Sequence, residues 1–575
     1  MPASPPPDMP PPLPPALARL LQDGYQLQLR EQYEAAARAY RKILKAAPEQ
    51  TEVLHLLGIV RARQGREAEA ITLYRQVVAR RPADAKAWYN LALAYGALGQ
   101  EADCIAAMDR AYALDKGLPL AANLLFPARR ARWDWRDHAA LLAGLRAGAM
   151  GQSAPTLPFL VLSLDEPGLH LAAARRMVAA EKTPARPLVF DHAARRVATG
   201  PIRLAYLSAD FRTHATTHLV GRLLARHDRT RFEVTAISIG PDDGSPQRRA
   251  VEAAADRFLD RKTASPEAIA REVAGLGIDI FIDLMGHTKG ERMAAFAHRP
   301  APVQVSYLGY PSTSGAPYFD YVVADAAVLP FADAGFFSEK IVHLPDTYQP
   351  NDPDPAIGPL PTRAACGLPD EGVVFCCFNG PEKLDPDTFS AFMRIVAAVP
   401  GSVLWMLAGR EGGPDNLRRE AAARGVDPAR LVFAPIASHA DHLARLARAD
   451  LFLDTFPYTA HTTASDALRM GVPMVTRTGR SFASRVAASL MAQMGLADFA
   501  TADAAAFEAT AIALARDPEA LAAARARLAA ARAASPLYDT DRYARHLERA
   551  YEEMIARYRA GAPPAAFAVA PLPPA

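Results

Sequence analysis

From residue 201 onward the chain alternates short apolar runs with longer amphipathic stretches. The runs have the length of strands, and the stretches between them have helical spacing. The candidate strands are 202–208, 232–239, 279–284, 302–308 and 321–324 in a first set, and 373–378, 402–408, 431–436, 451–454 and 473–476 in a second. This alternation predicts an α/β fold in which helices cover both faces of parallel sheets.

A segment rich in proline and acid separates the two sets near residues 345–370. We therefore expect two Rossmann-like halves, one at 199–355 and one at 356–562, with a long helix at about 540–559 closing the second. Paired halves of this kind bind ligands in the cleft between them, at the carboxyl ends of their strands. Residues that follow the strands are accordingly the first candidates for function.

The N-terminal region carries a repeat with a period of 34 residues. The positions in register are Gly24 and Gly58, Ala36 and Ala70, Pro48 and Pro82, Gly65 and Gly99, and the series Tyr40, Tyr74 and Met108. Each period reads as two short amphipathic helices with a small residue at their crossing and a proline after the second. The pattern resembles the tetratricopeptide repeat (TPR) and predicts an all-α superhelix over 16–118, with copies at 17–50, 51–84 and 85–118.

A TPR superhelix commonly holds an extended peptide or a partner helix on its concave face. In some repeat proteins a row of asparagines at the sixth position of each copy binds the peptide backbone. Here that position holds Gln22, Leu56 and Asn90, so an asparagine ladder is not supported. The repeats predict a binding surface without naming its partner.

The segments outside the repeats and the two halves carry no chemistry that we can read. Residues 119–198 are predicted to form a helical connector, with Trp133 and Trp135 as packing anchors. Residues 1–15, which include nine prolines, and the Pro- and Ala-rich residues 563–575 are predicted to be extended, disordered tails.

Composition narrows the function mainly by exclusion. The 65 Lys and Arg residues against 62 Asp and Glu leave a net charge of +3, so we expect no basic surface for nucleic acid or acidic membrane. The four cysteines fit neither a disulfide framework nor a zinc site, which indicates a reducing compartment with the cytoplasm as the expected location. No signal peptide and no 18-residue apolar stretch is present, so we expect neither export nor membrane anchoring.

The strongest local signal lies at 451–471, where a strand ends at Asp454 and a helix opens at HTTASD. A helix start presents unpaired N–H groups and the positive end of the helix dipole, which suit a phosphate. Thr462 and Thr463 are therefore candidate diphosphate contacts, and Asp466 could accept hydrogen bonds from ribose hydroxyls. The alternative is that Thr462 is only an N-cap and Asp466 a solvated acid in the first turn.

Other strand ends carry further candidates. Lys383, in FNGPEKLDP, could neutralise a leaving diphosphate without a metal, or could be a surface lysine beside two aspartates. His214, in SADFRTHATTHL, could lie over a sugar or serve as a structural loop histidine. His214 and His218 have the spacing of a zinc pair, but no third ligand is nearby and we expect no metal. In LGYPSTSG, Gly309 and Pro311 would let the backbone approach a sugar, although such turns are also common without a ligand.

Longer segments carry a more specific resemblance. They are DFRTHATTHL, TKGERMAAFAHRPAPVQVSYLGYPSTSGAPYFDY, FSEKIVHLPDTY, FNGPEKLDPDTF, VPGSVLWML, HTTASDALRMGVPMV and SFASRVAASLM. In the same order and spacing over about 17–540, they resemble the O-linked N-acetylglucosaminyltransferases that carry TPR repeats. The resemblance implies a GT-B fold and the transfer of N-acetylglucosamine from UDP-GlcNAc to Ser or Thr of proteins. It also implies inversion of the anomeric centre, with neither a metal nor a cofactor.

The resemblance further implies roles for single residues. Lys383, Thr462 and Thr463 would contact the diphosphate, and Asp466 would hold the ribose. At the uracil, Ala437 would offer backbone hydrogen bonds, His442 would stack on the ring and Arg445 would complete the pocket. Four residues would surround the sugar, namely His214, Gly309, Pro311 and His461. Lys383 and His214 are the residues expected to act in catalysis, on the leaving group and on the acceptor side respectively.

Two positions of the donor site depart from the family. His439 stands where the better-known members have lysine, and Tyr458 where they have cysteine. An enzyme of the same fold could use GDP-fucose or UDP-glucose, or could glycosylate asparagine. A TPR scaffold with an inactive transferase half is an alternative of another class, against which the lysine, the histidine, the threonine pair and the aspartate are all present. The expected partners are UDP-GlcNAc and acceptor proteins along the TPR surface, with neither nucleic acid nor membrane.

Overall fold

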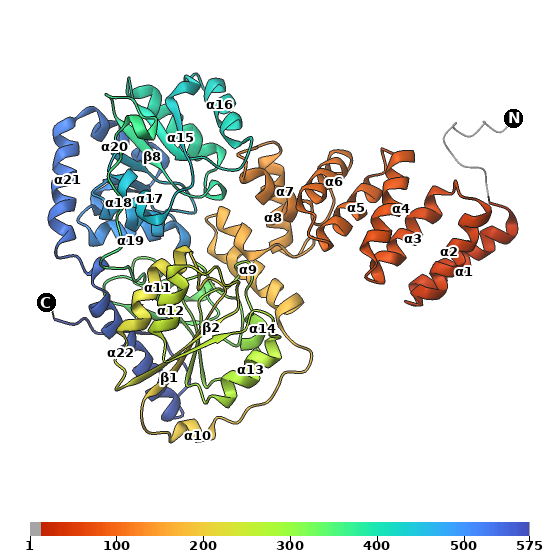
Figure 1. The fold of residues 1–575 in the computed structure, drawn as a ribbon, viewed down its shortest axis with the longest axis horizontal. Helices are drawn as coiled ribbons and strands as arrows, with labels where there is room; N and C mark the ends of the chain where they lie inside the picture. Colours follow the sequence, from red (N-terminus) through yellow and green to blue (C-terminus); the bar gives the residue numbers. More distant parts are fainter. Residues whose placement is uncertain (1–12, 574–575) are drawn as a thin grey trace. The chain divides into compact units, whose positions relative to one another are not determined.

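The computed structural model describes residues 13–573 of the chain, which form two compact units. The first comprises the chain up to Ala128 with Asp137–Gly144, and the second comprises Arg129–Arg136 and the chain from Leu145 onward. In Figure 1 the ribbon is coloured along the sequence, from red at the N-terminus to blue at the C-terminus. Residues 1–12 of the predicted N-terminal tail lie outside the described residues. Within the described part, no helix has both the length and the apolar character needed to cross a membrane.

The repeats form helix pairs, as the 34-residue period predicts. Their helices are α1 (Pro15–Leu29), α2 (Tyr33–Ala46), α3 (Thr51–Arg63), α4 (Glu67–Arg80), α5 (Ala85–Ala97) and α6 (Glu101–Leu114). Two further helices, α7 (Ala121–Arg130) and α8 (His138–Ala149), continue the alternation into the predicted connector. Each predicted copy therefore corresponds to one helix pair.

The period follows from packing between the two helices of a pair. A Cβ on Gly58 of α3 would lie 2.6 Å from the ring of Tyr74 on α4, and a Cβ on Gly24 would lie 2.8 Å from Tyr40. Because both rings are buried, the tyrosine requires the glycine opposite it. In the third copy Ala92 and Met108 replace the two residues together, and both are fully buried.

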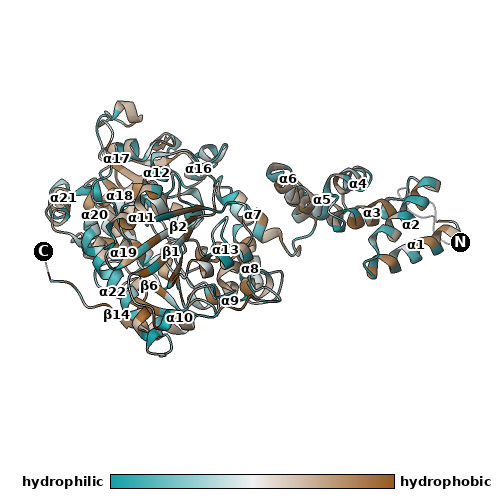
Figure 2. Ribbon diagram, turned by 60° about the horizontal axis from the view of Figure 1, so that its bottom comes forward, coloured by the Kyte–Doolittle hydropathy of each residue, from teal (hydrophilic) through white to brown (hydrophobic). Residues whose placement is uncertain are grey.

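The first half of the second unit is built on a parallel eight-stranded sheet with the order β14-β7-β6-β5-β4-β1-β2-β3. Its strands are β1 (Ile202–Ser208), β2 (Phe232–Ser238), β3 (Arg257–Asp260), β4 (Ile280–Asp283), β5 (Val303–Ser306), β6 (Tyr321–Asp325), β7 (Lys340–Leu344) and β14 (Phe567–Ala568). Its helices are α10 (Ala193–Arg196), α11 (Ala215–Arg226), α12 (Pro246–Ala254), α13 (Pro266–Gly275) and α14 (Met293–Phe296). Alternate residues of β1 enter different cores, Leu204 on one face and Ala205 on the other, which explains the unbroken apolar runs coloured brown in Figure 2.

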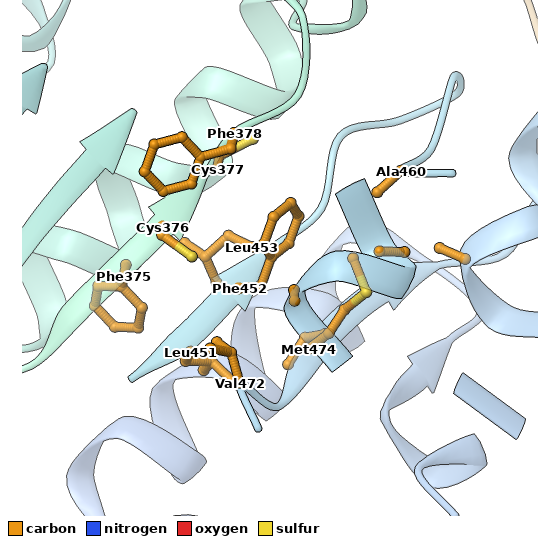
Figure 3. Close-up of a cluster of buried hydrophobic side chains, with 14 of the residues drawn as sticks. Phe375, Cys376, Cys377, Phe378, Leu451, Phe452, Leu453, Ala460, Val472 and Met474 are labelled. Atoms are coloured by element: carbon orange, nitrogen blue, oxygen red, sulfur yellow. The ribbon is translucent and has the colours of Figure 1, made fainter. Parts of the chain in front are cut away.

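The second half is built on a parallel six-stranded sheet with the order β10-β9-β8-β11-β12-β13. Its strands are β8 (Val374–Cys377), β9 (Val403–Leu407), β10 (Leu431–Ala434), β11 (Leu451–Leu453), β12 (Met474–Arg477) and β13 (Ala500–Thr501). Its helices are α15 (Pro386–Ala398), α16 (Gly413–Ala423), α17 (His439–Leu446), α18 (Thr462–Arg469), α19 (Val486–Gln493), α20 (Ala504–Arg516) and α21 (Pro518–Arg532). Figure 3 shows side chains of β8 and β11, including Cys376 and Phe452, in the core of this half.

The structure contains every predicted strand and adds four that the sequence pattern missed. These are β3, β7, β13 and β14. β3 is half-exposed and carries charge at both ends, so it lacks the continuous apolar run of a central strand. β13 and β14 are only two residues long.

The helix α22 (Thr540–Arg559) corrects one predicted boundary. The sequence pattern predicts that it belongs to the second half, but it packs on the first sheet, where Leu547 and Tyr551 enter the core around β1. The Tyr551 hydroxyl lies 3.0 Å from the hydroxyl of Tyr206 on β1. The apolar stripe of α22 is therefore buried against the first sheet, and the chain crosses between the halves twice.

The predicted C-terminal tail is wrong over its described part. β14 pairs in parallel with β7, with Phe567 opposite Val342, and Val569 is buried in the same core. Without β14, β7 would be an edge strand with free hydrogen-bonding groups. A short apolar segment in a proline-rich context was enough to cover that edge.

The predicted connector contains a 3-10 helix, η1 (Pro158–Ser163), and α9 (Pro167–Met177). Its two tryptophans pack against the second half. The ring of Trp133 lies 6.3 Å from that of Phe433, and the ring of Trp135 lies 5.3 Å from that of Phe389.

Candidate functional site: a cation and a helix start at a switch point

The strand orders of the two sheets decide where functional side chains converge. In the second sheet, the strand order runs outward in opposite directions from the neighbouring pair β8 and β11; in the first sheet the corresponding pair is β1 and β4. Loops at the carboxyl ends of such a pair diverge to opposite faces and leave a crevice in which ligands bind. Lys383 follows β8 and Thr462 follows β11, whereas His214 follows β1.

The Lys383 ammonium is partly buried and has few partners. Its Nζ donates a hydrogen bond to the backbone oxygen of Thr459 at 2.8 Å and lies 4.0 Å from the centroid of the Tyr458 ring. Within residues 13–573 it forms no ion pair. Burial lowers the pKa of Lys383 to about 8, although the charges of Glu382 and Asp454 act in the opposite direction. A cation in this state is prepared to receive an anion.

The start of α18 lies in the same loop, three residues after Thr459. Its N-cap is His461, whose side chain makes no capping hydrogen bond, so Thr462 is the first helical residue rather than the cap. In the described part of the chain, the backbone N–H groups of Thr462 and Thr463 have no acceptor. The Thr463 hydroxyl donates to Oδ1 of Asn379 at 2.5 Å. The helix therefore presents free N–H groups and the positive end of its dipole.

Sequence reasoning missed Asn379 and Asp454, which join the two loops. The Asn379 amide donates to Oδ1 of Asp454 at 3.0 Å and to the Thr455 hydroxyl at 2.8 Å. Asp454 is buried, and its carboxylate also accepts from the backbone N–H of Ala460 at 2.8 Å. Burial raises the pKa of Asp454 to about 6. Asp454 directly follows β11 and Asn379 is the second residue after β8, and that position at the ends of the switch-point pair is the signal that could have found them.

Asp466 is buried in α18 and is hydrogen-bonded to a histidine that contacts the first half. Both of its carboxylate oxygens lie 3.2 Å from Nε2 of His439 on α17. The His439 ring lies 4.2 Å from the ring of His218, which belongs to α11 of the first half. Burial, with a smaller contribution from His439, lowers the pKa of His218 to about 4. A cavity of about 380 Å³, lined by α11, α12 and residues near 352–356, opens beside these rings.

The residues predicted around the uracil lie on one loop and the helix that follows it. Nη1 of Arg445 donates to the backbone oxygen of Pro435 at 2.6 Å, and its Nε donates to Nδ1 of His442 at 3.1 Å. Burial lowers the pKa of His442 to about 4, so the ring is neutral near pH 7 and carries its proton on Nε2. Ala437 is exposed on the loop that Arg445 anchors.

His214 is the N-cap of α11, at the carboxyl end of β1. Its Nδ1 accepts a hydrogen bond from the Thr216 backbone N–H at 3.2 Å, and Oδ2 of Asp210 lies 3.5 Å from the same atom. Burial lowers the pKa of His214. His218, one turn further along α11, is the residue that contacts His439, so this end of the helix faces the second half.

The three remaining predicted sugar contacts come from two segments, Gly309 and Pro311 from the turn after β5 and His461 from the loop after β11. A Cβ on Gly309 would lie 1.8 Å from the backbone oxygen of Leu284, so packing against that strand end already requires the glycine. Pro311 is buried in the same turn. His461 lies beside Lys383 and Tyr458, and burial lowers its pKa well below the usual value. In residues 13–573 no group of three or more His, Cys, Asp and Glu could hold a metal ion, and all four cysteines are free thiols.

Comparison with known proteins agrees with this geometry. The family model of glycosyl transferase family 41 matches residues 178–354 and 350–547, and TPR models match 60–99 and 85–117. The chain belongs to glycosyl transferase family 41, and it carries TPR repeats ahead of that region.

The chain is 38% identical over 375 residues to the probable UDP-N-acetylglucosamine–peptide N-acetylglucosaminyltransferase SEC of Arabidopsis thaliana, covering 64% of this chain and 38% of that protein. It is 30% identical over 475 residues to the UDP-N-acetylglucosamine–peptide N-acetylglucosaminyltransferase of Caenorhabditis elegans, covering 63% and 41%. The chain thus spans about two fifths of the length of the curated relatives it matches. A solved mutant of the Thermobaculum terrenum O-GlcNAc transferase is similar over 95% of this chain and 98% of that chain, with a TM-score of 0.66 and 28% identity.

Proposed function

We propose that the protein transfers N-acetylglucosamine from UDP-GlcNAc to serine or threonine hydroxyls of protein acceptors, with inversion and without a metal ion. The observation that carries the proposal is the Lys383 ammonium, which has no counter-ion in the described chain and lies in one loop with the free N–H groups of α18. Family membership and the names of the relatives support the choice of sugar and acceptor.

The donor binds along the second half. Lys383 and the backbone N–H groups of Thr462 and Thr463 hold the diphosphate, because the Thr463 hydroxyl proton is already donated to Asn379. Asp466, oriented by His439, accepts hydrogen bonds from the ribose. His442 stacks on the uracil while the backbone near Ala437 and the side chain of Arg445 complete its pocket. Those contacts leave the sugar between His461 on the second half and the turn of Gly309 and Pro311 on the first.

In the reaction, the acceptor oxygen attacks the anomeric carbon while the bond from that carbon to the β-phosphate oxygen breaks. Lys383 and the α18 dipole stabilise the negative charge that grows on the leaving UDP. Nδ1 of His214 faces the Thr216 backbone N–H and the Asp210 carboxylate, so Nε2 is the ring nitrogen that would meet the acceptor hydroxyl. Because Nδ1 accepts from Thr216, Nε2 would act as a hydrogen-bond donor. The proton of the acceptor hydroxyl would then pass to a phosphate oxygen of the leaving group or into a water chain.

A donor panel tests the proposal. Purified protein is incubated with UDP-GlcNAc, UDP-glucose or GDP-fucose and with peptide or lysate acceptors, with and without EDTA, and the products are located by mass spectrometry. We expect transfer from UDP-GlcNAc to Ser or Thr that EDTA does not reduce. Preference for another donor, or a modified asparagine, would replace the substrate assignment while keeping the fold and the diphosphate site.

Calorimetry with UDP separates an enzyme from a TPR scaffold with an inactive transferase half. Binding that Lys383→Ala abolishes supports the enzyme, whereas no binding to the wild-type chain favours the scaffold. In the enzyme, the repeats present acceptor proteins to the second unit. We place the protein in the cytoplasm because four free cysteines suit a reducing compartment.

A further inference from the structure

An aromatic ring to which no role has been assigned contacts Lys383, and a second ring, from the connector, packs against the first. Tyr458 lies in the loop after β11, and its ring centroid is 4.0 Å from Nζ of Lys383. At this distance the negative face of the ring attracts the ammonium, and the attraction is largest where water is excluded. In the described chain, the ammonium thus contacts the Thr459 oxygen and this ring.

Tyr458 is held in turn by the connector. The ring of Phe159, on η1, packs edge-on against Tyr458 with centroids 6.0 Å apart. η1 is fixed on both sides: Leu162 is buried against Tyr310 of the first half and Ala483 of the second. The Tyr310 hydroxyl also donates to the backbone oxygen of Pro158 at 2.9 Å. Phe159 therefore projects from an anchored turn and packs against the Tyr458 ring.

We propose that Tyr458 is a positioning residue for Lys383 and that Phe159 of the connector sets the orientation of Tyr458. The segment between the repeats and the first sheet would then complete the diphosphate site, although it supplies no atom that touches the nucleotide. This inference rests on the proposed function for its role in catalysis, but the contact itself exists without donor.

A purely space-filling role for Tyr458 predicts something different. Leucine would fill much of the same volume but has no π face, whereas phenylalanine keeps the face and loses only the hydroxyl. If the ring stabilises the ammonium, Tyr458→Leu favours the neutral amine and Tyr458→Phe does not. The other titratable groups that face Lys383 are Glu382, Asp454, Cys377 and His461, and all of them are unchanged in both variants.

The first experiment reads Lys383 directly in the ligand-free, full-length protein. The chain has nine lysines, so 13Cε-lysine labelling gives few NMR signals, and Lys383→Met assigns the one of interest. We expect the wild type and Tyr458→Phe to titrate near pH 8 and Tyr458→Leu about one pH unit lower. Identical titration of Tyr458→Leu and wild type would overturn the proposal, whatever the protein does with UDP.

The second experiment reads the role of the connector. We expect Phe159→Leu to shift the Lys383 titration in the same direction as Tyr458→Leu but by less, and to weaken UDP binding severalfold at pH 8. The control is the same substitution at a ring beside a different cation, Phe499→Leu. Phe499 belongs to the second half, and its ring centroid lies 5.4 Å from the Arg527 guanidinium. Phe159→Leu behaving like this control would remove Phe159 from the proposal. Absence of UDP binding in the wild type would count against the proposed function alone.

Discussion

In the second half, the switch-point pair β8 and β11 ends in a cation and a helix start, whereas in the first half the pair β1 and β4 ends in a histidine and a carboxylate. Lys383 has no counter-ion among the described residues. The carboxylate oxygens of Asp283, at the end of β4, accept hydrogen bonds from the backbone N–H groups of Met285 and Gly286. The same topology thus places a lysine without an ion pair at the end of one strand pair and a buried, internally hydrogen-bonded carboxylate at the end of the other.

This difference teaches that parallel sheets determine where a site lies but not its chemistry. The crevice at the carboxyl ends follows from strand order. The side chains that follow each strand decide whether the crevice attracts a diphosphate or a hydroxyl group. Substitutions at the site of the second half should therefore act on the donor and its leaving diphosphate. Substitutions at the site of the first half should change the rate once the donor is bound.

The largest effect is expected from the second half. Lys383→Ala should lower turnover about 10³-fold, because it removes the only side-chain cation assigned to the leaving diphosphate. Circular dichroism and thermal unfolding should stay near wild type, since the lysine is partly buried and makes one hydrogen bond. Turnover close to wild type would contradict the assignment of this half to the donor.

A smaller effect on rate is expected from the first half. His214→Ala should lower kcat about 10²-fold while the Kd for UDP changes little. His214→Gln should recover part of the rate, because an amide N–H can replace the Nε2 donor. Equal loss in both variants would instead favour a general base, and an unchanged kcat would remove His214 from the reaction.

The proposed contact of Asp466 with the ribose tests donor binding in the second half separately from the diphosphate. Asp466→Asn should weaken UDP binding about tenfold, the usual worth of a hydrogen bond to a charged group. The loss should be smaller for 2′-deoxy-UDP if the carboxylate contacts the 2′-hydroxyl. Calorimetry with both nucleotides measures how much affinity Asp466→Asn costs for each. Equal losses would show that the carboxylate does not contact the 2′-hydroxyl.

The smallest effect is expected from pH. Lys383 holds the diphosphate only while protonated, and its pKa is lowered to about 8, so UDP affinity should be constant near neutrality and decline as pH rises through 8. The decline should reach about fourfold by pH 8.5 and should be absent in Lys383→Arg, whose side chain stays charged. A profile that is flat to pH 9 in the wild type would contradict the role of this lysine.

Particular residues mark the limit of sequence reasoning. Lys383 and Thr462 could be found because each follows an apolar run, Lys383 shortly before a helix and Thr462 at the first position of one. Asn379 and Asp454 follow strands too, but their importance lies in hydrogen bonds across 75 residues of chain, which no local pattern contains. His439 could be noted as a departure from the family, yet its contacts with Asp466 and His218 depend on three different helices.

The sequence by itself determined the repeats, the parallel strands and the short segments that carry chemistry, because these depend on local periodicity and on residue types at strand ends. Only the tertiary structure decided that α22 and β14 belong to the first sheet, and that the connector reaches Lys383 through Phe159 and Tyr458. Such choices depend on which of several apolar surfaces a segment buries. Which surface a segment buries depends on the whole folded chain, so it cannot be predicted from the neighbouring residues in the sequence.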